Sequence, residues 1–131
     1  MYAPVRSMAY KPCYNYSILR TMKKGLIIKK NWLDKIFDEG KIWEMRSTRT
    51  KVRGKIQLIE SGSGLIVGEA ELLDCYELPK AKQAETIGFH KVEDLQLLNK
   101  WKFAWLLSRA KRYEKPIPYK HPQGAVIWVN L

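Results

Sequence analysis

The chain has 131 residues, 46% of them hydrophobic, and a formal net charge of +11 at pH 7. This length suits a single domain. No apolar run approaches the roughly 18 residues of a membrane-spanning helix, and the opening "MYAPVRSMAYKPCYNY" lacks the apolar core of a secretory signal. We therefore expect a cytoplasmic, monomeric protein with no membrane partner.

The charge is unevenly distributed along the chain. Residues 1–56 hold 14 Lys and Arg against 4 Asp and Glu, residues 57–99 hold 3 against 8, and residues 100–131 hold 7 against 1. If the fold brings the two basic ends together, they form one electropositive face, for which a polyanion is the natural partner because neutralised phosphates release counterions. Charge that serves only solubility is the alternative, although a small domain needs few net charges for that.

The first half of the chain gives the clearest structural signals. Residues 1–22 show no period and are expected to form a loosely ordered extension, with a domain over residues 23–131. "GLIIK" (25–29) suits a buried strand, and "NWLDKIFDEG" (31–40) predicts a short amphipathic helix with Asn31 as N-cap and Gly40 as its end. "KIWEMR" (41–46) alternates like a strand, and Lys41 and Glu44 would then point to opposite faces.

The second half contains one hairpin and several weaker signals. Two β-rich runs joined by "SGSG" (61–64) predict a hairpin, and the spacing of Val92, Leu95 and Leu98 predicts a short helix over about 92–99. "KFAWLLSRAKRY" (102–113) fits either a strand or a helix, the stretch with prolines at 116, 118 and 122 predicts a loop, and "AVIWV" (125–129) predicts a terminal strand. The expected fold class is α+β, mostly β, with five or six strands and two or three short helices.

Several segments together resemble a known family. "GKIWEMR", "RGKIQLIESGSGLIVGEAELLDC", a Trp-rich run and "KPIPYKHPQGAVIWVNL" occur in the order and spacing of an ASCH domain, a relative of the PUA RNA-binding fold. The resemblance covers residues 23–131. It implies a PUA-like small β-barrel with a basic cleft, and it favours a strand for residues 102–113.

The same resemblance implies RNA or a modified nucleoside as the partner. Some members of the family are hydrolases, either amidohydrolases of N4-acetylcytidine or a ribonuclease. In the amidohydrolases, a lysine and a threonine three residues later belong to the working constellation. Lys41 matches the lysine, whereas Glu44 stands at the threonine position, so Lys41 and Glu44 are the candidate catalytic pair.

The position of Lys41 in the sequence allows two interpretations of its role. It follows the expected helix end, where a cation interacts favourably with the helix dipole. In a cleft, with Arg46 and Arg53 lowering its pKa, the same lysine could serve as a base or a phosphate ligand. His90 is a further candidate base, although a lone histidine more often caps a helix or lies at the surface.

The remaining candidates would bind RNA or a nucleoside. The guanidinium groups of Arg46 and Arg53 can donate paired hydrogen bonds to phosphate or carboxylate, although Arg46 could instead pair with Glu44. Trp43 is either a core residue or a stacking platform. Four further candidates lie at two turns, where an anion or a base edge could bind: Ser61, Gly62, Tyr119 and His121.

The sequence contains no cofactor or metal signature. It has no Walker loop, no GxGxxG and no CxxC pair, so we expect neither a cofactor nor a metal. The leading interpretation is an ASCH-type domain that binds RNA or a nucleoside. The alternative is a hydrolase of modified nucleosides or RNA, and a third interpretation is a protein-interaction module that uses the acidic residues 69–77.

Overall fold

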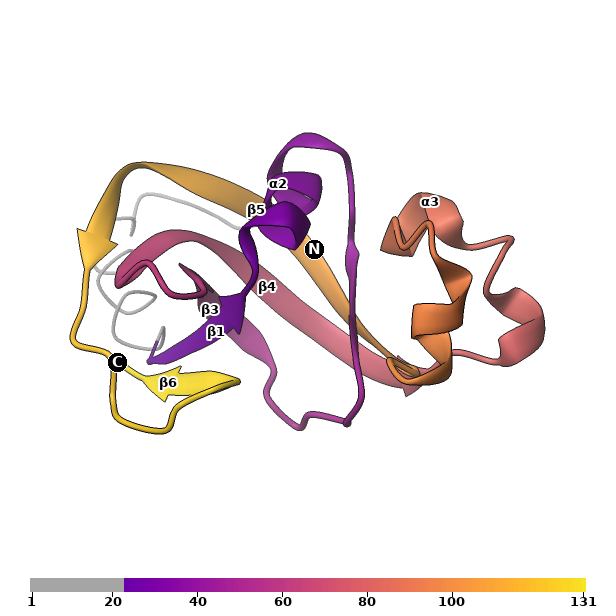
Figure 1. Ribbon diagram of the computed structural model, residues 1–131. Helices are drawn as coiled ribbons and strands as arrows, with labels where there is room; N and C mark the ends of the chain where they lie inside the picture. The colour runs from indigo at the N-terminus through magenta and orange to yellow at the C-terminus, as the bar shows by residue number, and fades with distance from the viewer. Residues whose placement is uncertain (1–22) are drawn as a thin grey trace, which may run out of the picture.

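A six-stranded mixed sheet forms the body of the protein (Figure 1). A computed structural model describes residues 23–131, so the expected extension over residues 1–22 lies outside the described residues. The strands are β1 (Lys24–Ile28), β2 (Trp43–Arg46), β3 (Gly54–Glu60), β4 (Leu65–Glu77), β5 (Phe103–Pro118) and β6 (Trp128–Asn130). Their order in the sheet is β2-β5-β4-β3-β1-β6, with β1 and β3 parallel and every other pair antiparallel.

The sheet is open, and the expectation of a closed barrel was wrong. β2 and β6 are its edges, and no pairing joins them within residues 23–131. The reason is their length. β2 pairs only with Phe103–Leu106 of β5, and β6 pairs only with Lys24–Leu26 of β1. The mostly β class and the six strands agree with the prediction.

The β3–β4 hairpin forms as the sequence predicts. Gly62 and Gly64 adopt φ angles of +79° and +73° in the turn, which few other residues tolerate. Further along β4, Gly68 lies where an added Cβ would collide with the backbone oxygen of Lys111 and the ring of Phe37. The absence of a side chain at Gly68 therefore lets β5 and helix α2 (Lys30–Asp38) approach β4 closely.

Helix α2 packs on the sheet through Leu33 and Ile36, which are buried with residues of β1, β3, β4 and β5. Its N-cap is Lys29 and not Asn31, because Lys29 is extended and its carbonyl accepts the Leu33 N–H at 3.0 Å. The predicted end is confirmed: Gly40 follows the helix with φ +75°. The chain then turns sharply towards β2.

The segment between β4 and β5 leaves the sheet and forms a projection at one end of the molecule (Figure 1). We call residues 78–102 the excursion. It contains the 3-10 helix η1 (Lys80–Lys82), helix α3 (Ile87–His90) and the 3-10 helix η2 (Leu95–Asn99). The predicted helix over 92–99 is thus only a 3-10 helix from Leu95, because the Asp94 side chain accepts the Gln96 N–H and starts the helix there.

Strand β5 confirms the strand predicted for residues 102–113 and extends beyond it. It continues to Pro118, so the loop expected around the prolines begins only after that residue. Among the described residues, β2 pairs with β5 no further than Leu106, so one side of the second half of β5 is unpaired, and proline is tolerated in such edge strands. No helix in the described part of the chain is long and apolar enough to span a bilayer.

Candidate functional site

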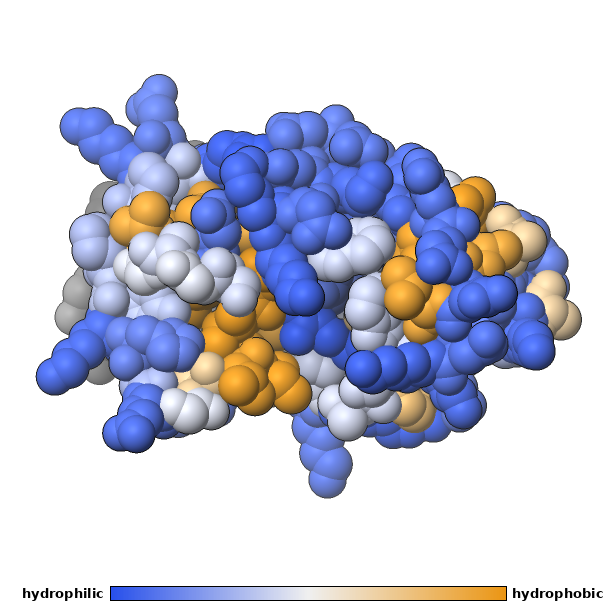
Figure 2. All heavy atoms as spheres, in the orientation of Figure 1, coloured by the Kyte–Doolittle hydropathy of each residue, from blue (hydrophilic) through white to orange (hydrophobic). Residues whose placement is uncertain are grey.

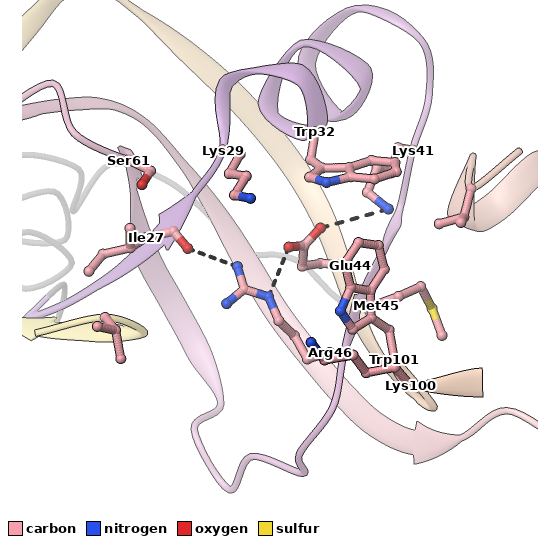
Figure 3. A pocket seen from close by; sticks show the side chains of 12 residues that line it. Ile27, Lys29, Trp32, Lys41, Glu44, Met45, Arg46, Ser61, Lys100 and Trp101 are labelled. Carbon is pink, nitrogen blue, oxygen red and sulfur yellow. Dashed lines mark hydrogen bonds and ion pairs between the residues drawn. The ribbon is translucent and has the colours of Figure 1, made fainter. Parts of the chain in front are cut away.

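A hollow of about 340 Å³ opens between α2, the start of β2 and the end of the excursion. We call it the central pocket. Figure 2 shows hydrophilic atoms at the bottom of a depression near the middle of this face, and Figure 3 shows the residues that line it. Its volume lies at the lower end of the about 300–1,000 Å³ of small-molecule sites.

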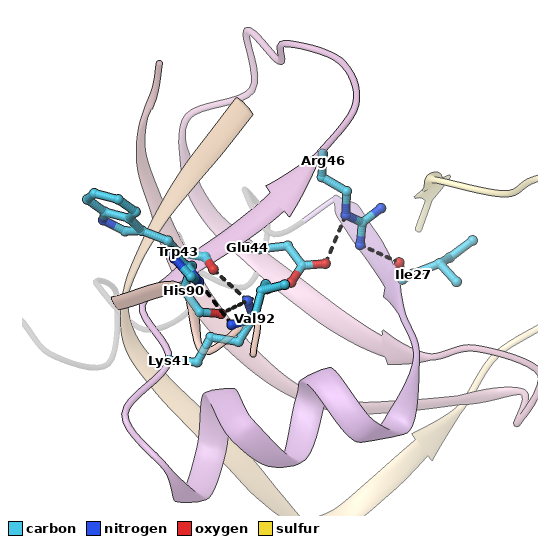
Figure 4. A network of polar contacts seen from close by, with 7 residues as sticks. All are labelled: Ile27, Lys41, Trp43, Glu44, Arg46, His90 and Val92. Atoms are coloured by element: carbon cyan, nitrogen blue, oxygen red, sulfur yellow. Dashed lines mark hydrogen bonds and ion pairs between the residues drawn. The ribbon is translucent and has the colours of Figure 1, made fainter. Parts of the chain in front are cut away.

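Lys41 lies at the inner wall of the central pocket with only 2% of its surface exposed. Its Nζ donates to the backbone oxygens of Trp43 at 2.7 Å and His90 at 2.6 Å (Figure 4). The ammonium also lies 3.7 Å from Glu44 Oε1 and 5.0 Å from the centroid of the Trp32 ring. The lysine is therefore a buried cation held by two carbonyls and a carboxylate, and not merely a charge near the end of the helix.

The contact between Lys41 and Glu44 corrects the predicted alternation. Lys41 and Ile42 precede β2: the Ile42 N–H bonds to Phe89 O at 3.0 Å, and the Ile42 oxygen accepts the Leu107 N–H at 2.7 Å. Because Lys41 is outside the regular strand, its long side chain is free of the strand's alternation. Lys41 and Glu44 can therefore meet on one side.

Burial lowers the pKa of Lys41 to about 8. The nearby negative charge of Glu44 raises the pKa, and the charges of Arg46 and Lys35 lower it further. Burial, and not the two arginines of the sequence hypothesis, is thus the main cause. The ammonium form still predominates at pH 7.

Within residues 23–131, Glu44 is the only carboxylate that lines the central pocket, and it is 4% exposed. Its Oε2 accepts the Nε–H of Arg46 at 2.9 Å, while an NH2 hydrogen of Arg46 goes to Ile27 O at 2.8 Å (Figure 3). Glu44 and Arg46 thus form the ion pair that was the alternative to ligand contact for Arg46. Lys41, Glu44 and Arg46 form a row of alternating charge along one wall.

Two tryptophans form the aromatic part of the central pocket. Trp32 comes from α2 and Trp101 from the end of the excursion, and their rings meet edge to face with centroids 5.8 Å apart. Lys29 and Lys100 also line the pocket, and both are exposed. The lining thus combines four cations and one carboxylate with two indole rings.

Trp43 and Arg53, two predicted binding residues, lie away from the pocket lining. The Trp43 ring packs in a second core against Phe89 and Tyr76, with centroid distances of 5.1 and 5.5 Å. The Arg53 guanidinium donates to two carbonyls of its own loop and lies 3.6 Å from Asp74. Trp43 contributes only its backbone oxygen, as the acceptor for Lys41.

The residues predicted at the two turns also lie partly inside and partly outside the pocket lining. Ser61 lines the central pocket, whereas Gly62 serves the turn. Tyr119 O–H and His121 Nδ1 lie 2.7 Å apart, and His121 Nε2 lies 2.9 Å from Ala125 O. Tyr119 and His121 therefore brace the loop that leads to Val126, a lining residue that is 75% exposed.

The sequence reasoning missed Trp32, Trp101, Lys29 and Lys100. They come from two segments about 70 residues apart, and neither segment carries a motif. The available signal was a repeated combination, a tryptophan close to lysine and asparagine in both "KKNW" and "NKW". Among residues 23–131, no three metal-ligating side chains cluster.

His90 is fully buried, with both ring nitrogens engaged. Nδ1 accepts the Val92 N–H at 2.9 Å, so Nε2 carries the proton that it donates to Gln83 O at 2.7 Å. Burial lowers the pKa of His90, and the nearby Lys41 charge lowers it further. The neutral imidazole is thus a structural part of the excursion, which holds the carbonyl that Lys41 binds.

Replacing Lys41 tests whether the buried ammonium holds this region together. Lys41→Met keeps most of the volume but leaves two buried carbonyls without a donor and Glu44 without one cation, so we expect a loss of about 3–5 kcal/mol in the free energy of unfolding. Urea denaturation measures it. Lys35→Met is the control, because it breaks a 3.6 Å pair with exposed Glu39, leaves the hydrogen bonds of Lys41 in place and should cost less than about 1 kcal/mol. Equal small losses would contradict the role of Lys41.

The pKa of His90 gives a pH prediction. Because the folded pKa is below the ordinary value of 6.5, the unfolded chain takes up the proton first, and the free energy of unfolding should fall as pH drops below about 6.5. His90→Asn keeps an acceptor for the Val92 N–H but does not titrate. It should be less stable than wild type at pH 7.5 and lose less between pH 7.5 and 5.5 in urea denaturation. Parallel losses in the two proteins would refute the assignment.

Comparison with known proteins gives the fold. No family model and no curated protein match the sequence. A crystal structure of ASCH from Zymomonas mobilis matches with a TM-score of 0.63 and 13% identity, over 84% of this chain and 87% of that one. Two single-residue variants of that protein also match at 13% identity and 84% of this chain, with TM-scores of 0.63 and 0.62 over 90% and 88% of theirs. The described chain therefore has the fold of an ASCH domain, as the resemblance predicted.

Proposed function

We propose that the protein binds RNA or a nucleoside and places one base in the central pocket. The observation that carries this proposal is the combination found there: two indole rings beside a carboxylate–guanidinium pair, with cations at the edge. Each of these groups suits a different part of a nucleotide. The ring of the base would stack on an indole, the polar edge of the base would form hydrogen bonds with Glu44 and Arg46, and the phosphate would contact the cations.

The tryptophans supply the stacking surface. Trp32 and Trp101 meet edge to face, so the two rings do not stack on each other. Stacking of a base on an aromatic side chain contributes about 1–3 kcal/mol and tolerates any base. A flat heterocycle is therefore a suitable occupant for this part of the pocket.

The row of charge supplies the polar contacts. Glu44 can accept hydrogen bonds, and Arg46 has five N–H donors, of which two are used by Glu44 and Ile27. An acceptor and a donor thus lie side by side, which suits a base edge that carries both kinds of group. Because Glu44 and Arg46 are already held in place by each other and by Lys41, their side chains lose little conformational entropy when a ligand binds.

The cations favour a phosphate-containing ligand. Neither Lys29 nor Lys100 has an ion-pair partner in the part of the chain that the structure describes. Together with the net charge of +11, they favour RNA over an uncharged nucleoside, since neutralised phosphates release counterions. The basic cleft expected from the resemblance is part of this proposal.

The lowered pKa of Lys41 favours a second candidate, a hydrolase of modified nucleosides or of RNA. A pKa of about 8 brings a lysine close to the range in which it can accept a proton at neutral pH, with Glu44 as its partner. Incubation with N4-acetylcytidine and with short RNA, followed by mass spectrometry, separates the candidates. A new product favours the hydrolase, and unchanged but bound ligand favours the binder.

The binding prediction concerns Trp101. Trp101→Ala should weaken binding of a single-stranded RNA roughly 5- to 150-fold, because it removes one stacking surface worth about 1–3 kcal/mol. Fluorescence anisotropy measures the affinity, and circular dichroism checks that the variant is folded. Phe89→Ala is the matched control, since this aromatic side chain is 46% exposed and outside the pocket.

The salt dependence supplies the second readout of the same experiment. The affinity should fall with salt at a slope of about −0.7 for each phosphate contacted. A flat response, or equal affinity of wild type and Trp101→Ala, would count against RNA as the ligand of this pocket.

A further inference from the structure

A second hollow, of about 350 Å³, lies at the base of the excursion, where the chain leaves β4 and returns to β5. We call it the basal pocket. We propose that it holds a neighbouring nucleotide of a single-stranded RNA whose base occupies the central pocket. This inference rests on the proposed function and narrows it, because it makes the ligand an oligonucleotide and not a free nucleoside.

The lining of the basal pocket has the chemistry for this role. Lys80 and Lys102 are exposed, and neither has an ion-pair partner within residues 23–131. The side-chain amides of Gln83 and Asn99 can each donate and accept hydrogen bonds. The one carboxylate, Glu77, already lies 3.6 Å from Arg49.

The apolar part of the basal pocket comes from the same two ends of the excursion. Leu78 and Leu98 are buried, and Pro79 lies beside them. The Leu78 N–H donates to Lys102 O at 2.8 Å and ties the two ends together. A lysine-flanked pocket with an apolar floor suits a phosphate joined to a sugar and a base better than it suits a simple anion.

The two pockets share one wall. In the segment 98–102, Lys100 and Trp101 line the central pocket, whereas Leu98, Asn99 and Lys102 line the basal pocket. Consecutive Cα atoms are about 3.8 Å apart, so the Cα atoms of Lys100 and Lys102 lie no more than about 7.6 Å from each other. Figure 3 shows Lys100 and Trp101 together at the edge of the central pocket. An RNA strand that crosses this segment would pass from one pocket to the other and run past Lys100.

Two linked sites predict that affinity rises with RNA length. Once a base occupies the central pocket, the next nucleotide meets the basal pocket at a high effective concentration. A mononucleotide reaches only one site, and its affinity should be independent of Lys80 and Lys102. The length dependence is therefore the property that the basal pocket controls.

The test measures the affinity of the full chain for RNA of one, two and four nucleotides, in an adenine and a uracil series, by isothermal titration calorimetry. Wild type should bind the four-nucleotide RNA roughly tenfold or more tighter than the mononucleotide. The Lys80→Ala/Lys102→Ala variant should lose most of this gain and keep its mononucleotide affinity. Its salt slope for the longest RNA should be shallower by about 1.4, for two lost phosphate contacts.

The control removes the same charge elsewhere. Lys111→Ala/Lys115→Ala changes two exposed lysines of β5 that line neither pocket, and it should keep the length dependence. The inference is overturned if both double variants lose the gain equally, or if all lengths bind wild type with one affinity. If RNA of no length binds, the proposed function itself fails and the basal site fails with it.

Discussion

The buried ammonium of Lys41 is the contact on which the candidate site depends. It joins three parts of the chain: the turn after α2, the start of β2 through Trp43 O, and the excursion through His90 O. A charge in this position is unfavourable unless it is paired and hydrogen-bonded, and the two carbonyls and Glu44 meet that need. The pocket wall is thus held by a group that cannot move without breaking several buried interactions.

The same contact links the sheet to the residues that would bind a ligand. Glu44 is held between Lys41 and Arg46, and Arg46 in turn binds the carbonyl of Ile27 on β1. On the other side, His90 and Val92 order the excursion that carries Trp101 and Lys100. A ligand in the central pocket would therefore contact both the rigid sheet and the excursion, and contacts to both would favour their present arrangement.

The sequence predicted local elements well and the site only in part. The "SGSG" turn and Gly40 follow from the conformations that glycine allows, and the Glu44–Arg46 pair follows from strand alternation. The burial of Lys41 could not be predicted, because it depends on His90, which is 49 residues away. The contact between Trp32 and Trp101 also joins segments that are far apart in the sequence. The open sheet also escaped prediction, since β6 pairs with β1 over only three residues and β2 with β5 over only four, and no motif in the sequence marks such short pairings.

The most direct test of RNA binding in the central pocket is ¹H–¹⁵N NMR. The indole N–H signals of the five tryptophans are recorded while a four-nucleotide single-stranded RNA is added. We expect the signals of Trp32 and Trp101 to shift with RNA concentration. The signal of Trp43, whose ring packs against Tyr76 and Phe89, should shift least. Shifts confined to Trp43 or Trp128, with Trp32 and Trp101 unchanged at saturation, would contradict it.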